Sequence, residues 1–261
     1  MLLYKFRDWK NESHKKLLRQ REIYFPSPND FNDPFDCFLM LRYDLLTDKE
    51  KKLKYEEIYR ANHPKASTSE VQLHVKRWKR LKLMETNYLL STSEKMLRDN
   101  NERIGIFSLT KTKTPILLWS HYASSHEGFA VGFDSEMLIE NIVSSFNYIN
   151  IEARYADVKY HPAYPIIIPR KIIGKGTSMK PLSTKSVEWS YEQESRIILF
   201  DGPREKLILK SNVFSEIILG CNIKQNDKEE ILIIAKSNFP NVKLLQAKKH
   251  SEKYSLIFEE I

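Results

Sequence analysis

The chain has 261 residues, and its 42 Lys and Arg against 34 Asp and Glu give a formal net charge of +8. Hydrophobic residues make up 41% of it, which excludes a disordered chain and suffices for one buried core. No apolar run reaches the roughly 20 residues of a membrane-spanning helix, and Cys37 and Cys221 match no metal or redox spacing. We expect a basic, cytoplasmic protein with two buried thiols and a single domain over residues 1–261.

The first forty residues predict two short strands, a helix and a turn-rich loop. Apolar and polar residues alternate over 2–7, which predicts a strand, and residues 13–20 are typical of a helix that Ser13 caps. A second strand over 23–25 ends in a cluster of Pro, Ser, Asn and Asp. Proline fixes φ, and Asn and Asp side chains bond to their own backbone, so we expect this loop to hold one shape.

Residues 41–100 predict a charged, helical insertion. They contain 14 basic and nine acidic residues. Apolar residues at helical spacing predict one buried face, made of Val71, Val75, Trp78, Leu81 and Tyr88. We expect the insertion to pack beside the main sheet. Its basic cluster over 76–82 fits an acidic partner, and a solvated helix face explains the same charges.

The rest of the chain mixes strands and helices. The elements that we expect are strands over 104–109, 128–133, 151–168 and 189–200, a helical turn over 117–123 and a helix over 135–146. Residues 169–186 hold five basic residues and no acidic one, which favours a mobile basic loop. Two strands, a helix and a final pair of strands follow. Several strands lack the helix that a parallel crossover needs, so the pattern predicts an α+β fold with a mostly antiparallel sheet.

Two carboxylates in the segment YEQESR form the first candidate site. In a strand, residues two apart share a face, so Glu192 and Glu194 would project together, with Arg196 next in the row. Like charges on one face repel unless a cation or a ligand separates them. The row is either an exposed face with cross-strand salt bridges or a pair that faces a substrate.

A second candidate is the aromatic segment LLWSHYASSHEGF. Trp119, His121, Tyr122 and His126 fall within eight residues, an arrangement that can present flat rings to a planar ligand. The alternative is that Trp119 and Tyr122 anchor the core. The histidines lack a third ligand at zinc spacing, so we expect no metal site. Arg7, on the first strand, matters only if that strand lies near Glu192 and Glu194.

Several segments together resemble a known family. LYKFR, IYFPSPNDFNDPFDC, IFSLTKTKTPILLWSHYASSHEGFAVGF and WSYEQESR occur in this order, and the series resembles the domain-of-unknown-function family 2971. More remotely, Arg7, Ser108 and the Glu192-Gln193-Glu194 pattern are similar to the three signatures of ADP-ribosyltransferases. The S-T-S triplet of those enzymes is missing from the middle strand, since Ser91-Thr92-Ser93 falls in the insertion.

The second resemblance implies a split, mostly antiparallel sheet and an enzyme that uses NAD. It implies that Glu194 holds the ribose and that Glu192 positions the acceptor nucleophile. Arg7 would bind a phosphate or ribose, Trp119 or Tyr122 would stack on nicotinamide, and Ser108 and His121 would complete the NAD site. The acceptor would be acidic, with nucleic acid as the natural choice, in a toxin or phage-defence role. A metal-dependent nuclease and a nucleic-acid-binding module without catalysis remain the alternatives.

Overall fold

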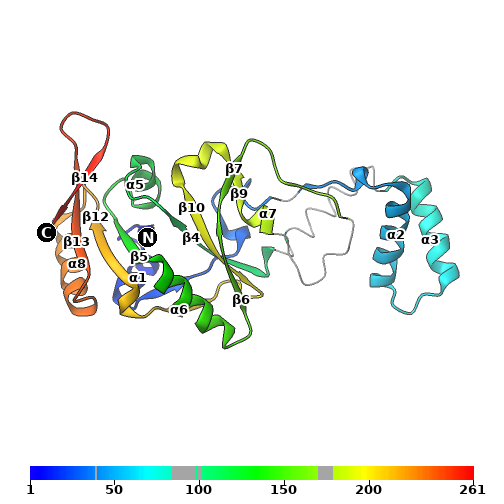
Figure 1. The fold of residues 1–261 in the computed structure, drawn as a ribbon, viewed down its shortest axis with the longest axis horizontal. Coiled ribbons are helices and arrows are strands. Elements are labelled where there is room, and N and C mark those ends of the chain that lie inside the picture. The colour runs from blue at the N-terminus through cyan, green and yellow to red at the C-terminus, as the bar shows by residue number, and fades with distance from the viewer. Residues whose placement is uncertain (39, 84–97, 99–100, 170–178) are drawn as a thin grey trace.

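The computed structural model describes the whole chain except residues 39, 84–97, 99–100 and 170–178 (Figure 1). An eight-stranded sheet forms its centre. In spatial order the strands are β14 (Leu256–Glu260), β13 (Lys243–Lys249), β12 (Phe214–Leu219), β5 (Phe129–Asp134), β1 (Leu2–Arg7), β4 (Ile104–Thr110), β10 (Glu194–Phe200) and β6 (Glu152–Asp157). The α+β fold with a mostly antiparallel sheet, predicted from the strand pattern, is confirmed.

The pairing of the sheet is antiparallel except between β12 and β13. Those two strands are parallel because helix α8 (Gln225–Asn238) connects them and returns the chain to the same edge. β1 registers with β5 at six positions, from Leu2 to Arg7. With β4, on its other side, it registers at one position only, Tyr4 opposite Thr110. The sheet is therefore weakly joined between β1 and β4.

One face of the sheet is covered by three helices, α1 (Glu12–Arg19), α6 (Ser135–Asn147) and α8. Their buried residues, such as Leu18, Ile142 and Ile231, pack with strand residues such as Phe133 and Ile217. Strand residues alternate between the two faces, so this core takes every second side chain of β4, β5, β10 and β12. The predicted helix over 135–146 is confirmed, and it is capped by Asp134, whose side chain accepts from Met137 N.

The opposite face is covered in two separate parts. Helix α5 (Ile116–Tyr122) packs with Tyr4, Phe6 and Ile218 at the β1–β5–β12 side of the sheet. Cys37 and helix α7 (Met179–Leu182) pack with Ile106 and Ile198 at the β4–β10 side. A cleft lies between these two clusters.

Short ladders hold the connecting segments. β2 (Glu22–Tyr24) pairs with β11 (Lys206–Ile208), β3 (Met40–Leu41) with β8 (Ile166–Ile167), and β7 (Lys159–His161) with β9 (Thr184–Ser186). The predicted basic loop over 169–186 is only partly within the described residues. Its last part is ordered as α7 and β9, and Lys185 is buried, so the expectation of a loop is wrong there.

The helical insertion is built around its own core. Helices α2 (Asp48–Asn62) and α3 (Thr68–Arg80) enclose Tyr55, Tyr59, Val71 and Val75. Figure 1 shows this pair at one end of the molecule, away from the sheet, so the expected packing beside the main sheet is wrong. Of the predicted apolar face, Leu81 is 48% exposed, and Tyr88 lies outside the described residues.

Two smaller expectations, on the cap of α1 and on the two cysteines, are also corrected. Asn11, not Ser13, caps α1, because its side chain accepts from Ser13 N. Cys37 is buried as expected, but beside polar groups, and Cys221 is only half-buried. Among the described residues, no helix is both long and apolar enough to cross a membrane.

Candidate functional site

A cleft of about 560 Å³ opens on the second face of the sheet. Its walls come from segments that lie far apart in the sequence. The residues that matter for its chemistry are Lys5 and Arg7 of β1, Ser108 of β4, His121 and Tyr122 of α5, Lys185 of β9, Glu192, and Glu194 of β10. The cleft thus contains the amino-terminal arginine and both carboxylates that the sequence singles out.

The backbone turns between the two carboxylates. Residues 189–200 do not form one strand as predicted, because Val187–Glu192 is a 3-10 helix and β10 begins at Glu194. Gln193 joins them with a left-handed φ of 43°. The expectation that one continuous strand places both carboxylates on the same face is therefore wrong, because only Glu194 belongs to the strand. Glu192 and Glu194 nevertheless converge, since both bind the same lysine.

Glu194 is held as a carboxylate by its own strand. Arg196 Nε donates to Glu194 Oε1 at 2.7 Å, and Arg196 Nη2 donates to Oε2 at 2.9 Å. Burial raises the pKa of Glu194, but the charge and hydrogen bonds of Arg196, the charge of Lys185 and a hydrogen bond from Ser108 lower it to about 2. Arg196 is fully buried, so the alternative of an exposed charged face is wrong.

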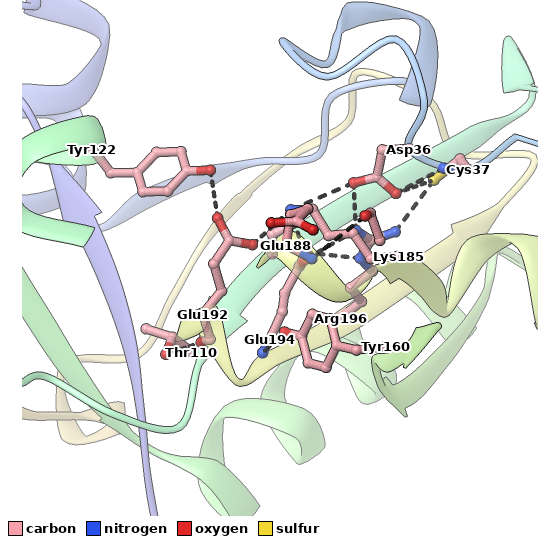
Figure 2. Close-up of polar contacts among 12 residues, drawn as sticks. Asp36, Cys37, Thr110, Tyr122, Tyr160, Lys185, Glu188, Glu192, Glu194 and Arg196 are labelled. Carbon is pink, nitrogen blue, oxygen red and sulfur yellow. Dashed lines mark hydrogen bonds and ion pairs between the residues drawn. The ribbon is translucent and has the colours of Figure 1, made fainter. Parts of the chain in front are cut away.

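Lys185 lies at the centre of three carboxylates (Figure 2). Its Nζ is 2.6 Å from Glu192 Oε2, 3.2 Å from Glu194 Oε2 and 3.7 Å from Asp36 Oδ2. Burial lowers the pKa of this ammonium, and the charges of Glu194, Glu192 and Asp36 raise it above its usual value. Lys185 therefore remains charged and neutralises a buried acidic cluster.

Glu192 is bound less completely than Glu194. Tyr122 donates its hydroxyl to Glu192 Oε1 at 2.7 Å, and Lys185 donates to Oε2 (Figure 2). Burial and the charge of Glu192 raise the pKa of Tyr122, so the phenol remains a donor. A carboxylate offers about four acceptor positions, which leaves Glu192 able to accept from a ligand.

The end of the cleft at β1 is cationic. Lys5 Nζ donates to Ser108 O at 2.6 Å, and within the described residues neither Lys5 nor Arg7 has an ion-pair partner. Burial lowers the pKa of Arg7 to about 10, and burial and the charge of Arg7 lower the pKa of Lys5 well below its usual value. Burial and these two cations also lower the pKa of His14 to about 4. This end therefore favours an anion.

Trp119 does not belong to this cleft. Its side chain is fully buried, its Nε1 donates to Lys113 O at 2.9 Å, and Phe6 packs edge-on against its ring at 4.9 Å. The alternative that Trp119 anchors the core is correct, and the expectation that it binds a cofactor is wrong. His126 also lies outside the cleft, stacked near Trp119.

Three members of the site are missing from the sequence-based set, and the first is Lys5, which lies two residues before Arg7. Lys185 falls in a segment that composition marks as loop, and Asp36 falls in the rigid loop after β2. Asp36 Oδ2 accepts from Arg196 Nη2 at 2.6 Å. Asp36 therefore holds Arg196 in place, and Arg196 in turn binds Glu194. The only local signal for Asp36 is the density of Asn, Asp and Pro around it, which indicates a fixed loop but no partner.

The comparison with family models gives one match. Residues 118–197 match DUF2971, a family of proteins of unknown function. The DUF2971 match begins in α5 and ends in β10, so it contains Tyr122, Lys185, Glu192 and Glu194 and excludes β1. The segments LYKFR and FNDPFD, which also suggested this family, lie outside it. No curated protein and no solved structure matches the chain, and the comparisons add no support for a likeness to ADP-ribosyltransferases.

Proposed function

We propose that the cleft binds NAD and that the protein transfers the ADP-ribose group to an acceptor. The observation that carries the proposal is the charge arrangement within one cleft, where Lys5 and Arg7, which have no ion-pair partner among the described residues, line the same hollow as Glu192. NAD carries both complementary charges, since its pyrophosphate is anionic and its nicotinamide ring is cationic. A cleft of about 560 Å³ lies within the usual range for small-molecule sites.

The chemistry that we assign is cleavage of the bond between nicotinamide and ribose. The bonding electrons leave with nicotinamide and neutralise its ring, while positive charge develops on the ribose. A fixed carboxylate near the ribose stabilises that charge. The acceptor then forms a bond to the anomeric carbon and loses its proton to a base. Tyr122 and Lys185 hold Glu192 in position to stabilise the positive charge on the ribose.

Of the two carboxylates, Glu192 is better suited than Glu194 to bind the ribose. The oxygens of Glu194 receive Arg196 twice and Lys185 once, whereas those of Glu192 receive one bond from Tyr122 and one from Lys185. Three donors leave Glu194 fewer free acceptor positions than the two donors leave Glu192. We therefore assign the ribose to Glu192, the reverse of the order that the family pattern implies. Glu194 then holds Lys185 and Arg196 in place.

The weak junction between β1 and β4 supports the same proposal. Because the two strands share only the pair Tyr4–Thr110, Lys5 and Arg7 project beside β4 and line the cleft. A split sheet with its ligand between the two parts is what the resemblance to ADP-ribosyltransferases implies. Ser91-Thr92-Ser93 lies outside the described residues, and Ser108 is the serine that lines the cleft.

The proposal is tested by incubating the purified protein with labelled NAD and cell extract. We expect loss of NAD and transfer of the label. Glu192→Gln should lower turnover by about 10²–10³-fold, the usual cost of removing one group that stabilises charge in a transition state. Glu216→Gln is the matched control, since Glu216 is a buried, lysine-paired carboxylate outside the cleft. Turnover that Glu192→Gln leaves unchanged, or no NAD consumption by the parent protein, contradicts the proposal.

The nuclease alternative finds little support in the arrangement. Asp36, Glu192 and Glu194 all face Lys185, so a divalent cation would have to displace a buried ammonium. Within the part of the chain that the structure describes, no group of three or more His, Cys, Asp or Glu side chains is arranged to hold a metal ion. Magnesium-dependent cleavage of nucleic acid without NAD would revive this alternative.

A further inference from the structure

A hollow of about 450 Å³ lies between α2 and α3, in the part of the molecule that the proposed transferase chemistry does not use. Tyr59, His63, His74, Arg77 and Trp78 line it. Figure 1 shows the two helices beyond one end of the sheet. Tyr59 and Trp78 belong to the core of the helix pair, but the two histidines and Arg77 extend this ring cluster to the surface.

The rings in this hollow are stacked. Tyr59 lies between two imidazoles, with centroid distances of 4.3 Å to His63 and 4.3 Å to His74 and interplanar angles of 18° and 21°. Tyr59 is buried, whereas His63 is exposed and His74 is half-buried. The Trp78 ring stands edge-on to Tyr59 at 6.1 Å. The stack thus ends in an accessible flat ring, the kind of surface on which a nucleobase stacks.

The same helix is strongly basic. The cations of α3 and the two residues that follow it are Lys76, Arg77, Lys79, Arg80 and Lys82. Within α3 the single acidic residue is Glu70, in the first turn, where it is bonded to Ser67. Arg77 is exposed and lines the same hollow as the ring stack. A polyanion is attracted to such a surface.

We propose that the α2–α3 pair binds single-stranded nucleic acid, with one unpaired base on the His63–Tyr59–His74 stack and the backbone phosphates along Arg77 and its neighbours. A duplex hides its bases from the rings, and an acidic peptide satisfies the charges but leaves the rings unused. The site recruits a strand independently of whether the cleft binds NAD, so either proposal can fail alone.

The test is fluorescence anisotropy of the intact protein with a labelled oligothymidine of about 12 nucleotides, within the usual site size for such strands. We expect binding that weakens steeply with salt, and weaker binding of a duplex of equal length. Tight binding of poly-glutamate, equal binding of the duplex, or no binding at low salt overturns the proposal.

Two variants with the same charge change locate the site. At about 100° per residue, Arg77 lies roughly 60° around the helix from His74, whereas Lys76 lies roughly 160° from it and points away from the hollow, which it does not line. Both side chains are exposed, so neither change threatens the fold. Arg77→Glu should weaken binding at least about tenfold and reduce the salt slope by about one, and Lys76→Glu should do much less. Equal losses of affinity in both variants would show that only the net charge matters and would refute the site.

A third variant separates stacking from charge. His74→Ala removes one ring without changing the basic cluster, and the loss of a stacked base should weaken binding about fivefold or more. Circular dichroism of the variant checks that the helix pair is intact. Unaltered affinity in a folded His74→Ala protein refutes the stacking half of the proposal.

Discussion

Replacement of Lys185 by Met tests how the acidic cluster of the cleft is stabilised. Lys185 Nζ is 2.6 Å from Glu192 and 3.2 Å from Glu194, and all three side chains are buried. At an effective dielectric constant of about 20, each pair contributes about 5–6 kcal/mol of attraction, most of which desolvation offsets. Methionine keeps the length of the side chain but leaves Glu192 buried without a cation. We expect the free energy of unfolding to fall by about 3–5 kcal/mol.

The assay is equilibrium unfolding in urea near neutral pH, with thermal unfolding as a second measurement. For a chain of this length, the expected loss corresponds to a fall of roughly 6–20 °C in Tm. Lys248→Met is the control, because Lys248 pairs with Glu259 on the surface and should cost less than about 1 kcal/mol. The double variant Lys185→Met/Glu192→Gln should recover part of the loss, since no orphan charge remains at Glu192. Equal effects at Lys185 and Lys248, or no recovery in the double variant, refute this reasoning.

Two further predictions concern the anion end of the cleft and the packing of β4. The pKa of His14 in the folded protein is about 4, below the usual 6.5, so the stability that neutral His14 contributes above pH 6.5 is lost as the pH falls toward 4. NMR titration should show this low pKa, and inorganic pyrophosphate bound by Lys5 and Arg7 should raise it. A pKa that pyrophosphate leaves unchanged refutes an anion site there. Gly105→Ala should lower the free energy of unfolding in urea by about 1–3 kcal/mol or more, since the new Cβ would collide with the backbone carbonyl of Gly202. In Gly202→Ala the new Cβ meets only side chains, so the loss should be smaller. A larger loss in Gly202→Ala than in Gly105→Ala contradicts the packing argument.

Most of the sheet could be predicted from the sequence because its signal is local. Strands such as β1, β4 and β5 alternate or form short apolar runs, and α6 combines a cap at Asp134 with helical spacing. The position of the helical insertion could not be predicted in this way. Amphipathic spacing indicates that Val71 and Val75 are buried, but not whether the partner is the sheet or a second helix. Here the partner is α2.

The sequence predicts only part of the candidate site, because it indicates residue types and local structure but not which segments meet. Residue type singled out Glu192, Glu194, Arg7 and Tyr122, and all four line one cleft. The strand pattern over 189–200 missed the turn at Gln193, because a single left-handed residue leaves no periodic signal. Lys185 escaped prediction because a lysine in a basic segment is normally solvated. Only the fold brings three carboxylates around it.

The two glutamates also show what a short acidic pattern leaves undecided. A pattern of two carboxylates separated by one residue identifies both as candidates, and their order in the chain says nothing about which one meets a substrate. Under the proposed function the hydrogen bonds favour Glu192, because Glu194 already accepts three hydrogen bonds from Arg196 and Lys185. Glu192, with one phenol and one ammonium, retains more acceptor capacity. Glu194→Gln should therefore disturb the cluster first and turnover as a consequence, whereas Glu192→Gln acts on turnover directly.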